Sequence, residues 1–113
     1  MPSDLPIDIE TRDGATIVRP SGEVDLARSP SLRTTLGQVI GDGVSRLVLD
    51  LSQVDYMDSS GVATLVEALQ QCRTRQATLV LSGLQDRVRS VFEIAKLDAV
   101  FTIRPDLDAA LGD

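Results

Sequence analysis

The stretch RLVLDLSQVDYMDSSGVATLVEALQQC, residues 46–72, decides how this chain folds. Its first six residues are almost continuously apolar, which is typical of a central strand covered on both faces. We interpret residues 52–58 as a loop. A helix follows, because apolar residues recur three and four positions apart from Val62 to Cys72. A buried strand, a loop and an amphipathic helix in this order favour an α/β domain with right-handed parallel crossovers.

Further strands and helices are expected on both sides of this unit. An Asp13-Gly14 turn predicts a hairpin between two short strands, and Ser29-Pro30 resembles a helix start with Ser29 as the cap. The expected strands are residues 7–11, 15–19, 22–26, 46–51, 78–82 and 100–103. The expected helices begin near residues 29, 59, 86 and 105, and the third is expected to turn Val88, Val91, Phe92 and Ala95 inward. Strands come first and then alternate with helices, which predicts one mixed sheet in a single domain over residues 1–113, with its core at about 7–111.

Composition limits the classes of partner. The chain has 17 acidic and 11 basic residues, a net charge of -6. This balance disfavours nucleic acid and anionic membrane surfaces. The negative charge either keeps the domain soluble or, alternatively, attracts a basic protein partner. No apolar run is long enough for membrane insertion, and the first residues lack the basic and apolar parts of a secretion signal. We therefore expect a cytoplasmic protein.

Several catalytic chemistries are missing from the sequence. The chain has no histidine and one cysteine, Cys72, which excludes an internal disulfide, a Cys-His pair and a Ser-His-Asp triad. Zinc sites of the usual kind need histidine or several cysteines. A phosphate-binding Gly-Lys-Ser/Thr loop is also lacking. We expect no enzymatic activity, no cofactor and no metal, and we interpret Cys72 as a small packing residue of the helix.

The segment Asp58-Ser59-Ser60-Gly61 is the candidate functional site. One interpretation is a well-capped helix start, because Asp and Ser side chains accept hydrogen bonds from the first backbone N–H groups. Two features go beyond capping. Two consecutive serines exceed what one cap requires. Gly61 in the first turn costs about 1 kcal/mol relative to Ala, and such a glycine often marks the close approach of another backbone.

Two hydrophobic residues, Tyr56 and Met57, precede this site. They fit either a hydrophobic staple against the helix or an exposed docking patch beside the serines. Phosphorylation of Ser60 would add about -1.5 to -2 charges. The helix dipole would tolerate that charge, so the fold would persist. A partner matched to a neutral hydroxyl would lose affinity.

Residues 49–62, LDLSQVDYMDSSGV, resemble the hallmark of STAS domains. More narrowly, they are similar to the bacterial anti-sigma factor antagonists of the sporulation and general-stress type. Gly22-Glu23-Val24-Asp25 resembles the second motif of that family, and residues 96–101 fit its tail. The resemblance covers about residues 7–111. It implies a four- to five-stranded mixed β-sheet with about four helices packed mainly on one face.

The resemblance also implies a function without catalysis. In such antagonists the serine before the motif glycine, here Ser60, is phosphorylated by an anti-sigma factor serine kinase, and a PP2C-type phosphatase resets the cycle. The unphosphorylated domain, a monomer when free, binds the kinase and frees the sigma factor. The partner-facing residues carry over to Asp25, Asp58, Ser59, Ser60 and Gly61. Asp25 alternatively fits a helix cap or turn.

Two other roles of STAS domains remain open at this point. One is a subunit of a lipid-transporting ABC system that docks on its ATPase, and the other is a stressosome-type scaffold subunit. Members of both groups retain a serine or threonine near the position of Ser60, and the helix at residues 63–69 is compatible with all three roles.

Overall fold

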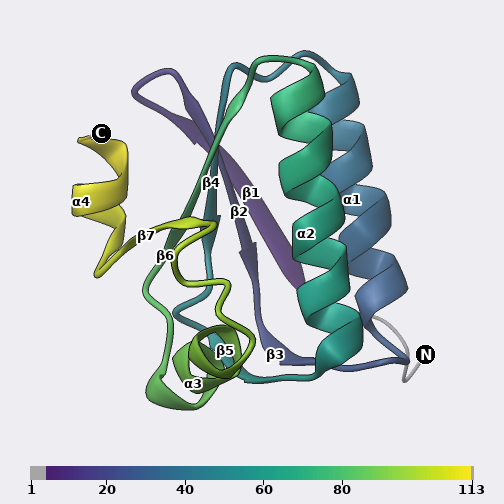
Figure 1. The fold of residues 1–113 in the computed structure, drawn as a ribbon. Coiled ribbons are helices and arrows are strands. Elements are labelled where there is room, and N and C mark those ends of the chain that lie inside the picture. The colour runs from purple at the N-terminus through teal and green to yellow at the C-terminus, as the bar shows by residue number, and fades with distance from the viewer. Residues whose placement is uncertain (1–4, 113) are drawn as a thin grey trace.

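A five-stranded mixed sheet forms the centre of the molecule (Figure 1). The computed structural model describes residues 5–112. The strands are β1 (Ile7–Arg12), β2 (Ala15–Pro20), β3 (Gly22–Val24), β4 (Arg46–Asp50), β5 (Val54–Met57), β6 (Thr78–Ser82) and β7 (Thr102–Arg104). The helices are α1 (Ser29–Gly41), α2 (Ser59–Thr74), α3 (Asp86–Ile94) and α4 (Leu107–Leu111).

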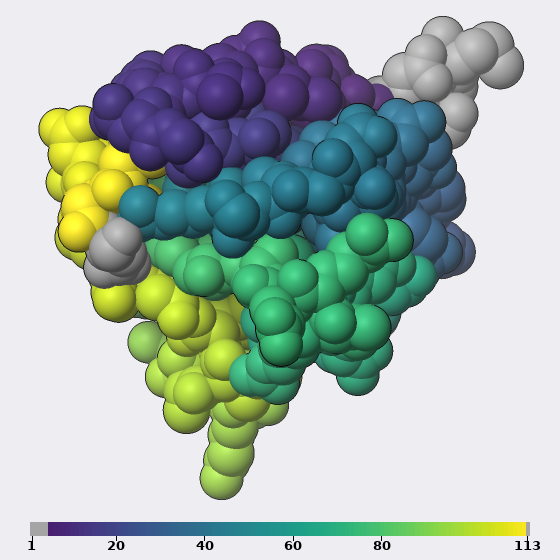
Figure 2. Space-filling model, turned by 90° about the horizontal axis from the view of Figure 1, so that it is seen from above, coloured from purple at the N-terminus to yellow at the C-terminus, as the bar shows by residue number. Residues whose placement is uncertain are grey.

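The sheet has the order β1-β2-β4-β6-β7. β1 and β2 form the antiparallel hairpin predicted at Asp13-Gly14, and the remaining neighbours are parallel. Helices α1 and α2 cover one face, whereas α4 lies on the other (Figure 1). In Figure 2, α4 (yellow) lies at the side of the molecule away from α1 (blue). The predicted α/β class, with a mixed sheet of up to five strands and four helices, is confirmed.

The main core lies between the sheet and the pair α1 and α2. Its fully buried side chains include Leu32 and Leu36 of α1, Leu47 and Leu49 of β4, and Leu65 of α2. Alternate residues of a strand point to opposite faces, so the remaining apolar positions of the central strands need a second cover. A smaller cluster on the α4 face provides it, and consists of Ala15, Ile17, Val48, Val80 and Ala110. The prediction that residues 46–51 form a strand covered on both faces is confirmed.

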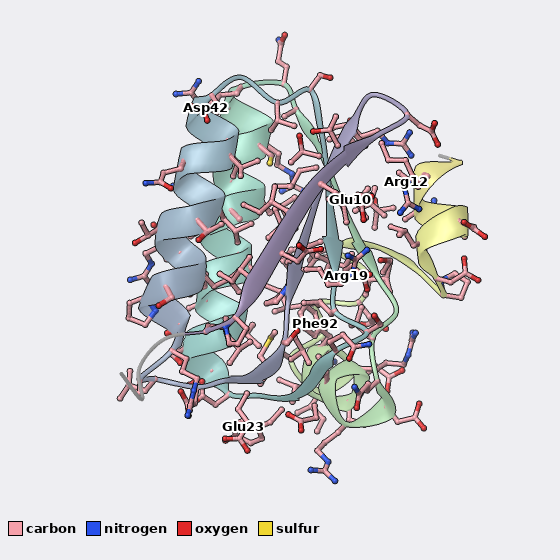
Figure 3. All side chains as sticks on the ribbon, turned by 180° about the vertical axis from the view of Figure 1, so that it is seen from behind. Glu10, Arg12, Arg19, Glu23, Asp42 and Phe92 are labelled. Atoms are coloured by element: carbon pink, nitrogen blue, oxygen red, sulfur yellow. The ribbon has the colours of Figure 1, made fainter. Side chains whose placement is uncertain are left out.

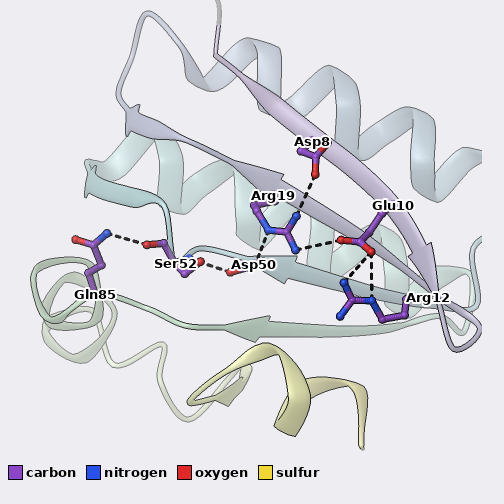
Figure 4. Close-up of polar contacts among 7 residues, drawn as sticks. All are labelled: Asp8, Glu10, Arg12, Arg19, Asp50, Ser52 and Gln85. Atoms are coloured by element: carbon purple, nitrogen blue, oxygen red, sulfur yellow. Dashed lines mark hydrogen bonds and ion pairs between the residues drawn. The ribbon is translucent and has the colours of Figure 1, made fainter.

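A polar cluster occupies the α4 face beyond this smaller core (Figure 4). Arg19 of β2 donates to the carboxylate of Asp50 at 2.8 Å, and it also contacts Asp8 and Glu10 of β1. Glu10 in turn accepts a hydrogen bond from Arg12 at 2.9 Å. The side chain of Asp50 is only 8% exposed. This arrangement pairs a buried carboxylate at the end of β4 with a guanidinium, which is the usual condition for burying a charge.

The prediction of a loop over residues 52–58 is wrong. Residues Val54–Met57 form β5, which pairs in parallel with β3 in a separate two-stranded sheet. The burial pattern of β5 is buried, exposed, exposed, buried, so it lacks the alternation by which a strand is recognised. The register between β3 and β5 shifts at Gly22/Glu23. A bulge of this kind disrupts the regular period of two.

Three smaller predictions at element boundaries are also wrong. Ser29 is the first residue of α1 and is buried, so it is not the cap; Arg28 takes that position without a side-chain cap bond. Ala95, expected to face inward, is exposed. The last strand begins at Thr102, and Val100 before it is exposed. Within residues 5–112, no helix combines the length and the apolar composition needed to cross a membrane.

Candidate functional site

The helix α2 begins at Asp58, which is its N-cap. The Oδ1 atom of Asp58 accepts hydrogen bonds from the backbone N–H of Ser60 at 2.9 Å and of Gly61 at 3.3 Å. The hydroxyl of Ser60 donates to the same oxygen at 2.5 Å. The capping interpretation of this segment is therefore confirmed. The cap also orients the side chain of the second residue of the helix.

Gly61 lies where another part of the chain passes closely. A Cβ atom at Gly61 would stand 2.9 Å from the carbonyl oxygen of Val24 and 2.6 Å from Cγ of Met57. The Val24 oxygen also accepts the backbone N–H of Asp58 at 3.3 Å. The close approach of a backbone, predicted from a glycine in the first turn, is confirmed, and the approaching strand is β3.

Ser60 is half-buried and Ser59 is exposed. One turn further along α2, the hydroxyl of Thr64 donates to the carbonyl oxygen of Ser60 at 2.9 Å. The backbone of Ser60 is therefore held in the first turns of the helix. The residue is partly exposed to solvent, and its hydroxyl is bonded to the carboxylate of Asp58 at the start of the helix.

The pKa of Asp58 lies below its ordinary value. The main cause is the hydrogen bond from the Ser60 hydroxyl. Partial burial opposes it, and backbone N–H groups of Gly61, Ser60 and Leu26 lower the pKa further. Asp58 is thus ionised near neutral pH, so the Ser60 hydroxyl is held by a carboxylate acceptor. A phosphate on Ser60 would lie next to this negative charge.

Asp25 closes the turn between β3 and α1. Its Oδ1 accepts the backbone N–H of Arg28 at 3.0 Å, and its Oδ2 lies 2.8 Å from the Arg28 guanidinium. Its carbonyl oxygen accepts the N–H groups of Arg28 and Ser29. The turn interpretation of Asp25 is confirmed. Asp25 is half-buried, and its contact with a partner stays a prediction.

Tyr56 and Met57 have opposite environments. Tyr56 is 41% exposed, whereas Met57 is only 3% exposed and packs against Gly61. The docking-patch interpretation therefore fits Tyr56 and is wrong for Met57 in the free protein, since a buried side chain offers no surface. Met57 instead packs against the first turn of α2, in the manner of a staple residue.

The strands β3 and β5 and the starts of α1 and α2 meet at one end of the molecule, which we call the Ser60 end (Figure 1). Figure 3 shows Glu23 of β3 at this end and Asp42, after α1, at the opposite end. A cavity of about 390 Å³ lined by Ile9, Gln38 and Asp42, among others, belongs to the opposite end. Among the described residues, no group of three acidic or thiol side chains is arranged to hold a metal ion.

Sequence reasoning missed two contributions to the site. The first is the carbonyl of Val24, which approaches Gly61 and accepts the Asp58 N–H. The second is Leu26, whose backbone N–H helps to lower the pKa of Asp58 and whose residue is 76% exposed. Both contributions come from the backbone, and a backbone contact has no signature of residue type. The sole available signal for the first was Gly61 itself.

The fold and the capped serine define a class of α/β domain with a mixed sheet and an aspartate-capped helix beside a serine. The STAS domain model matches residues 6–110, and the chain belongs to the STAS domain family. The chain is 36% identical over 103 residues to the anti-sigma-B factor antagonist of Listeria monocytogenes, covering 89% of this chain and 90% of that protein. It is 35% identical over 98 residues to the putative anti-sigma factor antagonist BtrV of Bordetella bronchiseptica, covering 87% and 84%.

A solved structure of an anti-sigma factor antagonist from Mycobacterium paratuberculosis is also similar. It superposes with a TM-score of 0.90 and 28% identity, covering 99% of this chain and 95% of that chain. The relatives found by sequence and the solved structure found by fold are thus all described as anti-sigma factor antagonists. The similarity covers most of the length of this chain and of each relative.

Proposed function

We propose that this protein is an anti-sigma factor antagonist controlled by phosphorylation of Ser60. In its unphosphorylated form it binds an anti-sigma factor serine kinase and so frees the sigma factor. The kinase transfers the γ-phosphoryl group of ATP to Ser60 Oγ; the hydroxyl proton is lost to solvent, and ADP leaves. A PP2C-type phosphatase hydrolyses the ester, which releases inorganic phosphate and restores the hydroxyl.

One observation carries this proposal: Ser60 is a partly exposed residue at the start of α2, and its hydroxyl is held by the carboxylate of Asp58. A helix start carries a partial positive charge, which favours an added anion. Asp58 repels it, and the two effects oppose each other. The fold therefore tolerates a phosphate of about -1.5 to -2 charges. A partner surface matched to the neutral hydroxyl does not.

The proposed contact surface consists of Asp25, Tyr56, Asp58, Ser59, Ser60 and Gly61. Gly61 contributes through its lack of a side chain, which lets β3 approach. Met57 supports the surface from beneath, because it is buried against Gly61. The 36% and 35% identical relatives, both described as anti-sigma factor antagonists, support the same role.

The test is a phosphorylation and binding assay with purified histidine-kinase-like anti-sigma factor ATPases and ATP. Mass spectrometry should find one added phosphate on Ser60. Ser60→Ala should abolish this modification and keep kinase binding, whereas Ser60→Asp should weaken binding by about tenfold or more, because it adds a charge beside Asp58. Thr74→Ala is the control, since Thr74 is an exposed hydroxyl residue at the far end of α2 and lies outside the proposed contact surface. It should behave as wild type in modification.

Two results would contradict the proposal. One is a Ser60→Asp variant that binds every kinase as tightly as wild type. The other is stable association with a transporter ATPase without phosphate transfer, which would favour the ABC-system role instead.

A further inference from the structure

The loop between β3 and α1 exposes a leucine next to the proposed phosphorylation site. Leu26 is 76% exposed, compared with 41% for Tyr56. Isolated exposed apolar residues are common on soluble proteins, and Ile94 is exposed to a similar degree in α3. Exposure alone therefore assigns no role to Leu26. A role must be argued from its position relative to Ser60.

Leu26 lies two residues beyond the end of β3, which packs against the start of α2. The carbonyl oxygen of Val24, the last residue of β3, accepts the backbone N–H of Asp58 at 3.3 Å and would lie 2.9 Å from a Cβ atom at Gly61. Asp58 in turn accepts the hydrogen bond of the Ser60 hydroxyl. The loop that carries Leu26 therefore leaves β3 next to the start of α2, where Ser60 lies.

A protein that reaches Ser60 must cover Leu26. Specific interfaces bury about 800 Å² on each partner, which corresponds to a patch of about 16 Å radius. A patch of this size centred on Ser60 includes Leu26. The leucine is then removed from water on binding, and it contributes to affinity if the partner offers an apolar surface there.

The backbone that carries Leu26 is already ordered in the free protein. Asp25 accepts the N–H of Arg28 at 3.0 Å and pairs with its guanidinium at 2.8 Å, and on the other side of the loop the Val24 carbonyl accepts the N–H of Asp58 at 3.3 Å. A loop held at both ends loses little conformational freedom when a partner binds. Burial of Leu26 is therefore not offset by the ordering of its loop.

The charges around Leu26 specify the rim of the partner surface. Residues 22–28 and 54–63 contain four carboxylates and one guanidinium, which belong to Glu23, Asp25, Asp55, Asp58 and Arg28. Glu23 and Asp55 are exposed, and Arg28 is neutralised by Asp25. An acidic surface attracts a basic one and repels other acidic surfaces.

We infer that Leu26 is the hydrophobic anchor through which this protein docks on its anti-sigma factor kinase, and that the kinase receives it in an apolar pocket with a basic rim. This inference rests on the proposed function, because it takes the kinase of Ser60 as the occupant. It adds a residue outside the Asp58–Gly61 segment that determines affinity and choice of kinase.

The experiment measures the Kd for the kinase that phosphorylates Ser60, by titration calorimetry without ATP. Leu26→Ala should raise Kd by about tenfold or more, as is typical of a truncated anchor. Leu26→Asp should raise it further, and Leu26→Met, which conserves volume, should stay within about threefold of wild type. Ile9→Ala is the matched control, since Ile9 is 49% exposed and lines the cavity at the Asp42 end. Thermal unfolding should be unchanged for the Leu26 variants, since the side chain is exposed.

The possible failures are distinct. If wild type binds the kinase and is phosphorylated, but Leu26→Ala and Leu26→Asp bind equally well, this inference is overturned and the proposed function stands. If Ile9→Ala weakens binding as much as Leu26→Ala, the anchor role is also overturned, because the loss is then not specific to the Ser60 end. If wild type binds none of the kinases, the proposed function fails, and the occupant assigned to Leu26 fails with it.

Discussion

Replacement of Gly61 by alanine tests whether the close approach of β3 holds the start of α2. Alanine is favoured over glycine within a helix by about 1 kcal/mol. At Gly61, however, the new Cβ would stand 2.6 Å from Met57 Cγ, 2.9 Å from Val24 Cγ1 and 2.9 Å from the Val24 carbonyl oxygen. The methionine side chain can move. The carbonyl belongs to β3, which pairs with β5, so its displacement disturbs that pairing.

Overpacking of this kind costs about 1–3 kcal/mol, and contact with backbone places Gly61 at the upper end. After the gain in helix propensity, Gly61→Ala should lower the free energy of unfolding by about 2 kcal/mol. For a domain of this size, the Tm should fall by about 8 °C. Urea denaturation followed by far-UV circular dichroism measures the free energy, and a thermal scan measures the Tm.

Gly37 provides the matched control within α1. A Cβ at Gly37 would meet no atom within 4 Å, so Gly37→Ala should stabilise the protein by up to about 1 kcal/mol. The two substitutions are chemically identical and should have effects of opposite sign. A Gly61→Ala protein that is as stable as wild type, or more stable, would refute the role assigned to the Val24 carbonyl.

Two further predictions concern buried polar groups. Burial raises the pKa of Asp50, but hydrogen bonds from Arg19 and Ser52 outweigh it and hold the pKa below its usual value; Asp50 therefore stabilises the fold above the ordinary carboxyl pKa, and this stabilisation is lost as pH falls through its lowered pKa. Arg19→Met should lower the free energy of unfolding by about 2 kcal/mol near neutral pH. The loss should shrink progressively in acid, where Asp50 is protonated, as urea denaturation at several pH values would show. Arg12→Met, at a more exposed ion pair, should cost less than Arg19→Met, and equal losses for both variants would contradict this account. Cys72 is fully buried, and burial raises the pKa of its thiol. A thiol reagent should therefore label Cys72 only in unfolded protein. Rapid labelling of the native protein would disprove its packing role.

The central unit of the fold could be predicted because its pattern is strong. Residues 47–49, the centre of β4, are apolar without interruption, and α2 repeats its apolar positions at helical spacing. The apolar run of β4 follows from burial of the strand on both faces, and the helical spacing in α2 follows from burial of one face of the helix. The Asp13-Gly14 turn has a similarly direct cause, because both residues have positive φ in the structure, as a type I′ turn requires.

The β3–β5 pair could not be predicted because its strands are short and irregular. β3 has three residues, and β5 lacks alternation because the register shifts opposite it. The start of α1 was predicted wrongly for a different reason. Ser29-Pro30 resembles a cap followed by a first turn, but Asp25 accepts the hydrogen bonds of the N–H groups there. A residue four positions upstream had replaced the expected local cap.

The candidate site was partly visible in the sequence. Asp58 as the cap and Gly61 as a point of close approach follow from residue type at a helix start. The exposure of Tyr56 and the burial of Met57 could not be predicted from residue type, because both residues are hydrophobic and adjacent. The path of β5 determines which of the two side chains is buried. The position of Leu26 follows from the approach of β3 to the start of α2 and had no local signal.

The Ser60 hydroxyl is held by the carboxylate of Asp58, whose backbone N–H is bound by the main-chain carbonyl of Val24, while Leu26 and Ala27 are exposed in the loop that follows β3. Main-chain groups are the same whatever residue carries them. A duplicated copy of this gene can therefore exchange those two side chains without displacing the hydroxyl. Under the proposed function, paralogues that differ at these two positions would carry the same chemical signal and still answer to different kinases.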